Sequence, residues 1–332
     1  MKFLFRMTPQ GAFYNNNQFL HSYDSPFPKS DTVFKAIVNA WEILWGEDST
    51  KKLTDKFQKV KKEEDIPFYL SSVFPVLGNT YFLPRPLALE FHQDKNVHHA
   101  KDQINWVSAE IYRDWLRGEK FAWNVENLLF PGLYFHAKDA AAIRLQTKDK
   151  LAWSDDDGRT RNQVNPITAE TTVYPANQIF YAEKLDWYLL VACQDEMQKK
   201  LTSIFRLLAD EGIGGRRNIG CGGYLYQPPV ALPETMDFVA TPVQNNFAIL
   251  SLYYPMAEQI SSGLLNQARY QLIERQGWHT DSQGEAKQQG KLRLFKEGSC
   301  FGAASTFGPR LIEAGKHCYH YVYPFRIAAP AM

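Results

Sequence analysis

The sequence has few cysteines, and none of them lie close together. The four cysteines, Cys193, Cys221, Cys300 and Cys318, include no C-x-x-C pair, which argues against a zinc site or a disulfide framework and favours a reducing compartment. No window approaches about eighteen apolar residues, so we expect no transmembrane helix. The first residues, MKFLFRMTPQ, contain too short an apolar run for a signal peptide. These absences predict a cytoplasmic protein without a membrane partner.

Catalytic motifs of several enzyme classes are also missing. The chain has no HD dipeptide and no GGDD, G-x-S-x-G or H-E-x-x-H stretch. His98 and His99 have no obvious carboxylate or cysteine partner at metal-ligand spacing, so we expect neither a metal site nor a cofactor. The formal net charge is only +1. Any nucleic-acid site must therefore be a local basic patch, whose positive charge is balanced in the net charge by acidic residues elsewhere.

The hydrophobic pattern predicts strands and helices that alternate along the first two thirds of the chain. Residues 2–8 read as a strand with Phe3 and Phe5 on one face, and residues 66–86 as two short strands around a Gly78-Asn79 turn. Ser30 stands where an N-cap belongs, before a helix that ends at Gly46.

A second group of elements surrounds the most unusual stretch of the sequence. Residues 187–193 read as a strand, and residues 195–210 as a helix with Gly212 in the position of a C-terminal cap. After about residue 235 the pattern starts again, with a strand at 247–255, a helix over 257–275 and further strands. With 332 residues, 45% of them hydrophobic, the chain can form about two domains.

We therefore expect an α+β protein of two units. The first covers residues 1–235, with insertions at about 90–180 and a glycine-rich loop at 212–223. The second covers residues 236–332.

The glycine-rich loop is not one of the common nucleotide-binding loops. It contains six glycines in twelve positions and reads GIGGRRNIGCGG from Gly212 to Gly223. Arg217 stands where G-x-G-x-x-G needs its last glycine, and Cys221 stands where the P-loop needs lysine. Both of those loops follow a strand and open a helix, whereas this one follows a helix and leads into a strand.

Such a loop can still bind an anion. Glycines allow close approach of another backbone, and exposed N–H groups can form anion-binding nests. Arg216 and Arg217 supply forked donors suited to phosphate, and Asn218 can contact base or sugar edges. The alternative is a tight connection in which the glycines only relieve steric crowding, and density alone does not decide between the two.

Five stretches, taken in order, resemble a known family. They are SDTVFKAIVNAW (30–41), PFYLSSVFPVLGNTYFLPRP (67–86), DEGIGGRRNIGCGG (210–223), KEGSCFG (296–302) and the closing strand HYVYPFRI. Helix, glycine loop and strand in this order are similar to the RAMP proteins of CRISPR systems. Among these, the chain resembles the subunit conventionally numbered four in the type III-A, Csm-type complex, with a departure at Arg216 to Ile219.

The resemblance implies a fold and a role. The fold would be two ferredoxin-like (RRM-like) RAMP domains with an inserted thumb hairpin, to be sought in residues 140–180. The role would be non-catalytic: binding the crRNA 5′ handle, docking the large cyclase/polymerase-like subunit, and contacting the adjacent backbone RAMP subunit in antiviral defence. Single-stranded RNA is recognised through splayed bases, phosphates and 2′-hydroxyls, which suits such a loop.

These considerations predict a set of RNA-binding residues. We expect Arg216, Arg217 and Asn218 to contact RNA, and the neighbouring glycines to let the RNA backbone approach: Gly214, Gly215, Gly220 and Gly222. Weaker candidates are Lys29, Ser30, Arg85 and Arg161. Two other functions remain open. One is a RAMP endoribonuclease that processes precursor crRNA, with His21 as its general acid or base. The other is a protein-binding module with a purely structural loop.

Overall fold

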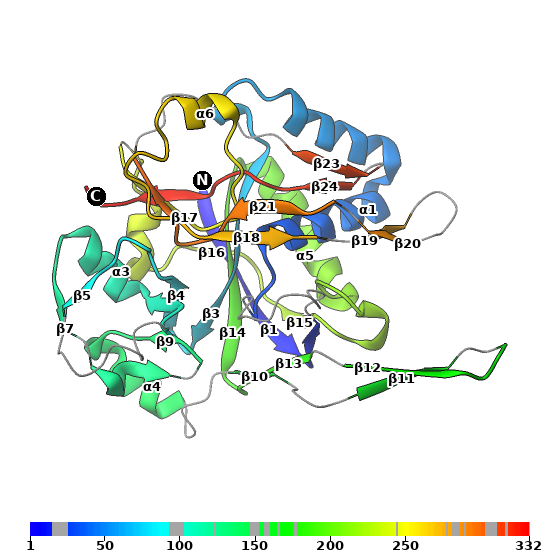
Figure 1. Cartoon of the computed structure of the whole chain (residues 1–332), viewed down its shortest axis with the longest axis horizontal. Coiled ribbons are helices and arrows are strands. Elements are labelled where there is room, and N and C mark those ends of the chain that lie inside the picture. The colour runs from blue at the N-terminus through cyan, green and yellow to red at the C-terminus, as the bar shows by residue number, and fades with distance from the viewer. Residues whose placement is uncertain are drawn as a thin grey trace.

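Figure 1 shows the computed structural model of the chain. It describes residues 1–14, 26–92, 103–122, 124–129, 131–146, 153–155, 160–164, 167–175, 178–243, 245–276, 278–280, 286–288, 290–302, 311–315 and 318–331. The α-helices are α1 (Ser30–Lys59), α3 (Ala109–Leu116), α4 (Ala140–Gln146), α5 (Asp195–Glu211) and α6 (Ala257–Ser261). Short 3₁₀ helices are η1 (Glu63–Asp65), η2 (Val125–Asn127), η3 (Ala137–Asp139), η4 (Arg217–Ile219) and η5 (Glu234–Ala240). Within these residues, no helix combines the length and apolar character needed to cross a membrane.

The fold is mixed α+β around one large sheet. Its path runs β15 (Gly223–Tyr226), β1 (Lys2–Gln10), β14 (Leu185–Cys193), β3 (Phe68–Leu77), β4 (Thr80–Pro84), β6 (Trp106–Ser108), β9 (Leu133–Tyr134) and β8 (Leu128–Leu129). β16 (Val230–Ala231) also pairs with β1. The predicted pair of strands within 66–86 is confirmed as β3 and β4, which are joined at Gly78 and Asn79.

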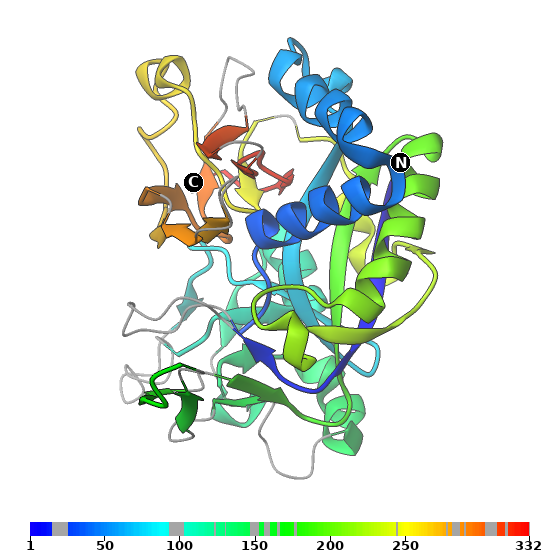
Figure 2. The same cartoon turned by 90° about the vertical axis from the view of Figure 1, so that its right-hand side faces the viewer.

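Strands β1 and β14 are neighbours inside this sheet and are largely buried on both faces. They pair antiparallel, with Phe3 opposite Val191 and Phe5 opposite Leu189. The Phe5 ring lies 4.3 Å from the ring of Phe205 on α5, measured between centroids. Leu4, which points to the opposite face, is as fully buried as its neighbours. Helices α1 and α5 run beside each other along the sheet (Figure 2).

Helix α1 departs from prediction at both ends. Lys29 occupies the N-cap position, so the predicted Ser30 cap is wrong by one residue. The physical reason is that the Ser30 hydroxyl accepts a hydrogen bond from the Leu252 N–H at 3.0 Å instead of capping the helix. Gly46 ends the first helical segment as predicted, with φ of 78°, and a second segment then continues to Lys59 at a different angle (Figure 2).

The region after residue 246 packs onto the first two thirds of the chain. Its strands form two small sheets, β22 (Cys300–Phe301)–β17 (Phe247–Ile249)–β25 (Arg326–Ala328) and β18 (Leu272–Arg275)–β21 (Leu292–Phe295), and two hairpins, β19 (Trp278–Thr280)–β20 (Ala286–Gln288) and β23 (Ile312–Gly315)–β24 (Cys318–His320). The predicted helix over 257–275 is wrong, because α6 ends at Ser261 and β18 begins at Leu272.

Buried polar contacts hold this region against α1 and β3. The Lys29 ammonium lies 2.7 Å from a Glu297 carboxylate oxygen, and the Tyr323 hydroxyl donates to the Phe57 carbonyl at 2.7 Å. Ala248, Leu250 and Ile327 belong to the same hydrophobic core as β1 and β14. The division of the chain at residue 235 stays a prediction.

Three further groups of strands complete the fold. They are β10 (Trp153–Asp155)–β13 (Gln178–Tyr181)–β2 (Phe13–Tyr14), the parallel pair β5 (Phe91–His92)–β7 (Phe121–Ala122), and the hairpin β11 (Thr160–Val164)–β12 (Thr171–Pro175). The hairpin projects from the body at the lower right of Figure 1. It carries exposed apolar side chains, including Val164, Ile167 and Val173.

Candidate nucleic-acid interface

The glycine loop begins where α5 ends and closes upon itself before β15. The Gly212 N–H donates to the Leu208 carbonyl at 2.9 Å and caps the helix, as predicted. The Ile213 N–H donates to the Gly222 carbonyl at 3.0 Å, which ties the two ends of the loop together. Strand β15 then pairs with β1, placing Gly223 opposite Gln10. The loop is thus anchored on the helix and on the sheet at once.

Two of the glycines are required because the beginning and the end of the loop pass close to each other. A Cβ atom on Gly222 would lie 2.0 Å from the Ile213 carbonyl oxygen, and one on Gly212 would lie 2.7 Å from the Cys221 carbonyl oxygen. Both glycines also have positive φ, at 78° and 79°. Because the obstructing atoms are backbone atoms, no side chain can be accommodated at either position.

Two more glycines pack against aromatic rings. A Cβ atom on Gly214 would lie 2.7 Å from Cε2 of Phe13, and one on Gly215 would lie 2.7 Å from Cδ1 of Tyr14. Both rings are buried. Steric crowding inside the protein therefore accounts for Gly214 and Gly215 without any ligand.

Gly220 differs from these four glycines. It has φ of 82°, and no atom would lie within 4 Å of an added Cβ. Asn218 and Ile219 beside it are exposed, Ile219 with 47% of its surface accessible. Asn218, Ile219 and Gly220 thus form the exposed apex of the loop, the part on which another molecule can lie.

The two arginines have different surroundings. Arg216 adopts the left-handed conformation at φ 55° and ψ 34°, and its guanidinium carbon lies 4.5 Å from the centroid of the Tyr14 ring. Arg217 opens the 3₁₀ turn that follows, and its guanidinium lies 3.7 Å from a carboxylate oxygen of Glu211 on α5. Both arginine side chains are partly exposed next to the apex.

The sequence analysis did not identify Phe13 and Tyr14, the two aromatic residues on which the glycine loop packs. These residues form β2, which pairs with β13 by placing Phe13 opposite Ile179 and Tyr14 opposite Gln178. The Phe13 ring packs edge-on against Trp187 of β14. The sequence gives one available signal: the alternating strand that begins at residue 2 runs directly toward these two aromatic residues.

The loop's return to the sheet is tied down by further side chains. The Gln178 amide donates to the Cys221 thiol sulfur at 3.3 Å. The Tyr224 hydroxyl donates to the Phe205 carbonyl at 2.6 Å, and burial raises the pKa of this tyrosine well above its ordinary value. The Tyr224 hydroxyl therefore holds β15 against α5.

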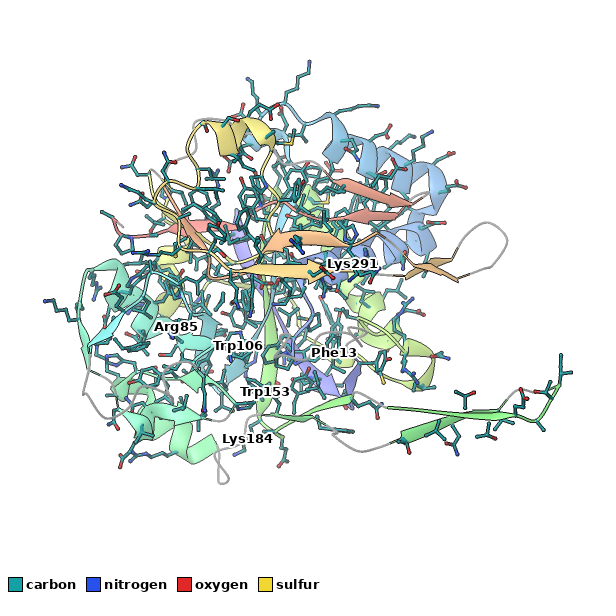
Figure 3. All side chains as sticks on the ribbon, viewed as in Figure 1. Phe13, Arg85, Trp106, Trp153, Lys184 and Lys291 are labelled. Atoms are coloured by element: carbon teal, nitrogen blue, oxygen red, sulfur yellow. The ribbon has the colours of Figure 1, made fainter. Side chains whose placement is uncertain are left out.

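The weaker sequence candidates are not brought to this loop. Lys29 is buried against Glu297, and Ser30 accepts from Leu252, so both side chains are engaged inside the protein. The Arg85 guanidinium lies 5.3 Å from the Phe91 ring, well away from Phe13 in Figure 3. Arg161 lies on strand β11, opposite Tyr174. His21, the residue named for the nuclease alternative, lies outside the described residues.

Among the residues that the structure describes, no group of three or more His, Cys, Asp or Glu side chains is placed to hold a metal ion. His98 and His99 lie outside that part of the chain.

Comparison with known proteins identifies a family at the C-terminal end. Residues 243–330 match the model of the CRISPR Csm4 C-terminal domain. The CRISPR-system protein Csm4 of Methanocaldococcus jannaschii is 23% identical over 336 residues, covering 87% of this chain and 81% of that protein. Csm4 of Thermococcus onnurineus is 26% identical over 199 residues, covering 59% of this chain and 61% of that protein.

Solved structures share the fold over nearly the whole chain. A chain of the Csm3–Csm4 subcomplex of the type III-A CRISPR-Cas interference complex superposes with a TM-score of 0.68 at 19% identity, covering 98% of this chain and 99% of its own length. A chain of the Csm1–Csm4 cassette in complex with cA4 gives 0.59 at 17% identity, with 99% and 98% covered. The resemblance inferred from the sequence is therefore confirmed: the chain is similar to the Csm4 proteins of type III-A CRISPR complexes, and its residues 243–330 match the model of the Csm4 C-terminal domain.

Proposed function

We propose that this chain is a non-catalytic RNA-binding subunit of a type III-A CRISPR interference complex, which binds the 5′ handle of the crRNA. The glycine-loop apex carries this proposal. There, exposed Asn218, Ile219 and Gly220 adjoin two arginines on a rigid base of buried rings. An exposed backbone with open space at Gly220, beside forked cationic donors, suits a single strand whose phosphates and 2′-hydroxyls are accessible.

Within the loop, we assign separate roles to its residues. Arg216 and Arg217 bind phosphate oxygens, and Asn218 contacts a sugar or base edge. Gly220 allows the RNA backbone to approach, because the space beside it is open. The other predicted glycines, Gly214, Gly215 and Gly222, serve the RNA indirectly by letting the loop pack tightly on Phe13, Tyr14 and its own backbone.

We also propose the finer fold that the family resemblance implies. The sequence β1, α1, β3, β14, α5, β15 with strand order β15-β1-β14-β3 is the order expected of a ferredoxin-like unit, which supports that assignment for the first RAMP domain. We assign a second ferredoxin-like domain to residues 236–332. The projecting hairpin β11–β12 is our candidate for the thumb, and Arg161 on it a candidate RNA contact.

The partners of this subunit are the large cyclase/polymerase-like Csm subunit and the adjacent backbone RAMP subunit, in the cytoplasm. The structures that share its fold support these two partners, since they come from complexes that contain Csm1 or Csm3. Lys29, Ser30 and their buried partners join the C-terminal region to α1 in this proposal and do not contact RNA.

The experiment that tests this function is purification of the tagged chain from its native host, followed by sequencing of the RNA that accompanies it. Small RNAs that share one repeat-derived 5′ end, recovered with a large cyclase-like protein, are the expected result. An Arg216→Ala/Arg217→Ala variant provides the control, because it should recover the protein partner with much less RNA. Recovery of no RNA by the unaltered chain would overturn the proposal, and recovery of partners alone would favour the protein-binding module.

A further inference from the structure

The backbone at Arg216 is unusual for a residue with a side chain. Among the described residues, Arg216 and Ala169 are the non-glycine residues with positive φ. The left-handed region is strained for an arginine, whereas a glycine adopts it freely. In a loop of six glycines, an arginine at this position indicates that its side chain has a role that offsets the strain.

The Arg216 side chain is held against an aromatic ring. Its guanidinium carbon lies over the Tyr14 ring, 4.5 Å from the ring centroid, and Tyr14 is itself only 4% exposed. Strand β13 fixes the Tyr14 backbone by pairing with β2, and Gly215 closes against the ring from the loop side. The ring is therefore a rigid support and not a mobile surface group.

Stacking on a ring suits a guanidinium that must bind a phosphate. A ring contacts the flat face of the guanidinium, while the N–H donors lie in its plane and point sideways. The orientation of the side chain is thus fixed before the phosphate binds. Binding therefore costs little further side-chain conformational entropy.

Arg217 does not share this arrangement. It pairs with Glu211 at 3.7 Å, and both side chains are substantially exposed. A phosphate that binds Arg217 competes with the Glu211 carboxylate.

From these contacts we infer that Tyr14 is a positioning residue that holds Arg216 as a phosphate-binding side chain of the loop. This inference rests on the proposed function, since it names the part of the glycine loop that grips the RNA backbone. Tyr14 acts only through Arg216 and itself touches no phosphate.

The test uses the full-length chain and a fluorescent synthetic crRNA whose 5′ end is the handle encoded by the host's own repeat. Affinity is measured over a salt series, and melting temperature is measured in parallel. Arg216→Gly should weaken binding about tenfold, the loss expected for one charge-assisted contact. It should reduce the slope of log affinity against log salt by about 0.7, the value for one phosphate contact on a single strand. The melting temperature should not fall, because glycine relieves the strained backbone.

Three further variants separate positioning from charge. Arg216→Lys keeps the charge but loses the planar face, so it should weaken binding with the salt slope nearly unchanged. Tyr14→Phe keeps the ring and should bind as the unaltered chain does. Tyr14→Leu removes the ring and should reproduce the Arg216→Lys effect. If Tyr14→Leu does not fold, Tyr14→Met takes its place, because it also removes the ring while filling more of its volume.

Two results would overturn the inference, and they differ from failure of the proposed function. The first is unchanged affinity and slope for Arg216→Gly alongside weakened binding by Arg217→Ala, which would assign the phosphate to Arg217. The second is equal affinity for the unaltered chain and for either Arg216→Lys or the folded variant that lacks the Tyr14 ring. In both cases handle binding itself would stand. If the unaltered chain bound the handle no better than a crRNA with a scrambled 5′ end, the proposed function would fail first.

Discussion

The Lys29 ammonium and the Glu297 carboxylate form an ion pair at 2.7 Å with both side chains almost fully buried. The Ser72 hydroxyl also donates to this carboxylate. Burial acts to raise the pKa of Glu297, but the charge of Lys29 and the hydrogen bonds outweigh it, and the pKa is lowered. The pair joins the start of α1 to a segment 268 residues further along the chain.

Removal of one member of this pair should destabilise the protein strongly. Lys29→Met leaves the Glu297 charge buried without its cation, and we expect a loss of about 3–5 kcal/mol in the free energy of unfolding. The double variant Lys29→Met/Glu297→Gln removes both charges and keeps an acceptor for Ser72, so it should recover most of that loss. Urea unfolding of the three proteins measures this. Equal stability of the single and double variants would contradict a buried pair.

Stability should depend on pH through Asp31. Burial acts to raise the pKa of this carboxyl, but Arg275, His320 and Lys35 hold it well below the ordinary value. A lowered pKa in the folded state contributes stability above the unfolded pKa of about 3.9 and loses it as pH falls further. Asp31→Asn should therefore be less stable than the unaltered chain at pH 7, with a difference that shrinks below about pH 4.

Unfolding curves at pH 7 and pH 3 check this, with Asp48→Asn, an exposed acid on the same helix, as the control. A difference that stays constant between the two pH values would show that the Asp31 charge is not the cause.

Alanine substitutions at Gly222 and Gly118 test whether the loop glycines are required for steric reasons. Both have positive φ, at 78° and 76°, but only Gly222 has backbone atoms where a Cβ would lie. Gly118→Ala should cost about 1–2 kcal/mol, the ordinary strain of a left-handed alanine. Gly222→Ala should cost clearly more, because the Ile213 carbonyl must move. Thermal melts compare the stabilities of the two variants. Equal losses of stability would mean that Gly222 and Ile213 are less closely packed than the structure shows.

Gly220 offers a change that affects RNA without crowding the fold. Asn and Asp both tolerate the left-handed backbone, and open space surrounds the position. Gly220→Asp places a negative charge at the apex and should weaken handle binding by about 1 kcal/mol, roughly fivefold, in low salt. Gly220→Asn adds similar bulk without the charge and should bind more tightly than the Asp variant. Identical affinities for the two would place the RNA away from the apex.

The nuclease alternative is tested through His21. We expect the purified chain to leave labelled precursor crRNA uncut, and His21→Ala to bind the handle with unchanged affinity. Gel electrophoresis of the RNA after incubation shows either result. Cleavage by the unaltered chain that is lost in His21→Ala would replace the scaffold with a processing enzyme.

Much of the core could be predicted because the periodicity of apolar residues along the sequence matches the faces that the fold buries. The strand within 187–193 and the helix over 195–210 carry their own periodicity, and Gly212 ends the helix for a local steric reason. The predicted helix over 257–275 was wrong because the apolar spacing there matches a helix, whereas residues 272–275 pair with β21. Strand pairing with residues 292–295 is a distant contact that no local pattern displays.

By itself, the sequence determined that a glycine loop follows a helix and that two arginines stand within it, because both are properties of neighbouring residues. Only the tertiary structure decided what each position does. The antiparallel pairing of β1 with β15 brings the loop over Phe13 and Tyr14, about two hundred residues away in sequence. That contact makes Gly214 and Gly215 packing residues and stacks Arg216 on a ring. It also leaves open space on the side of Gly220 where a Cβ atom would point.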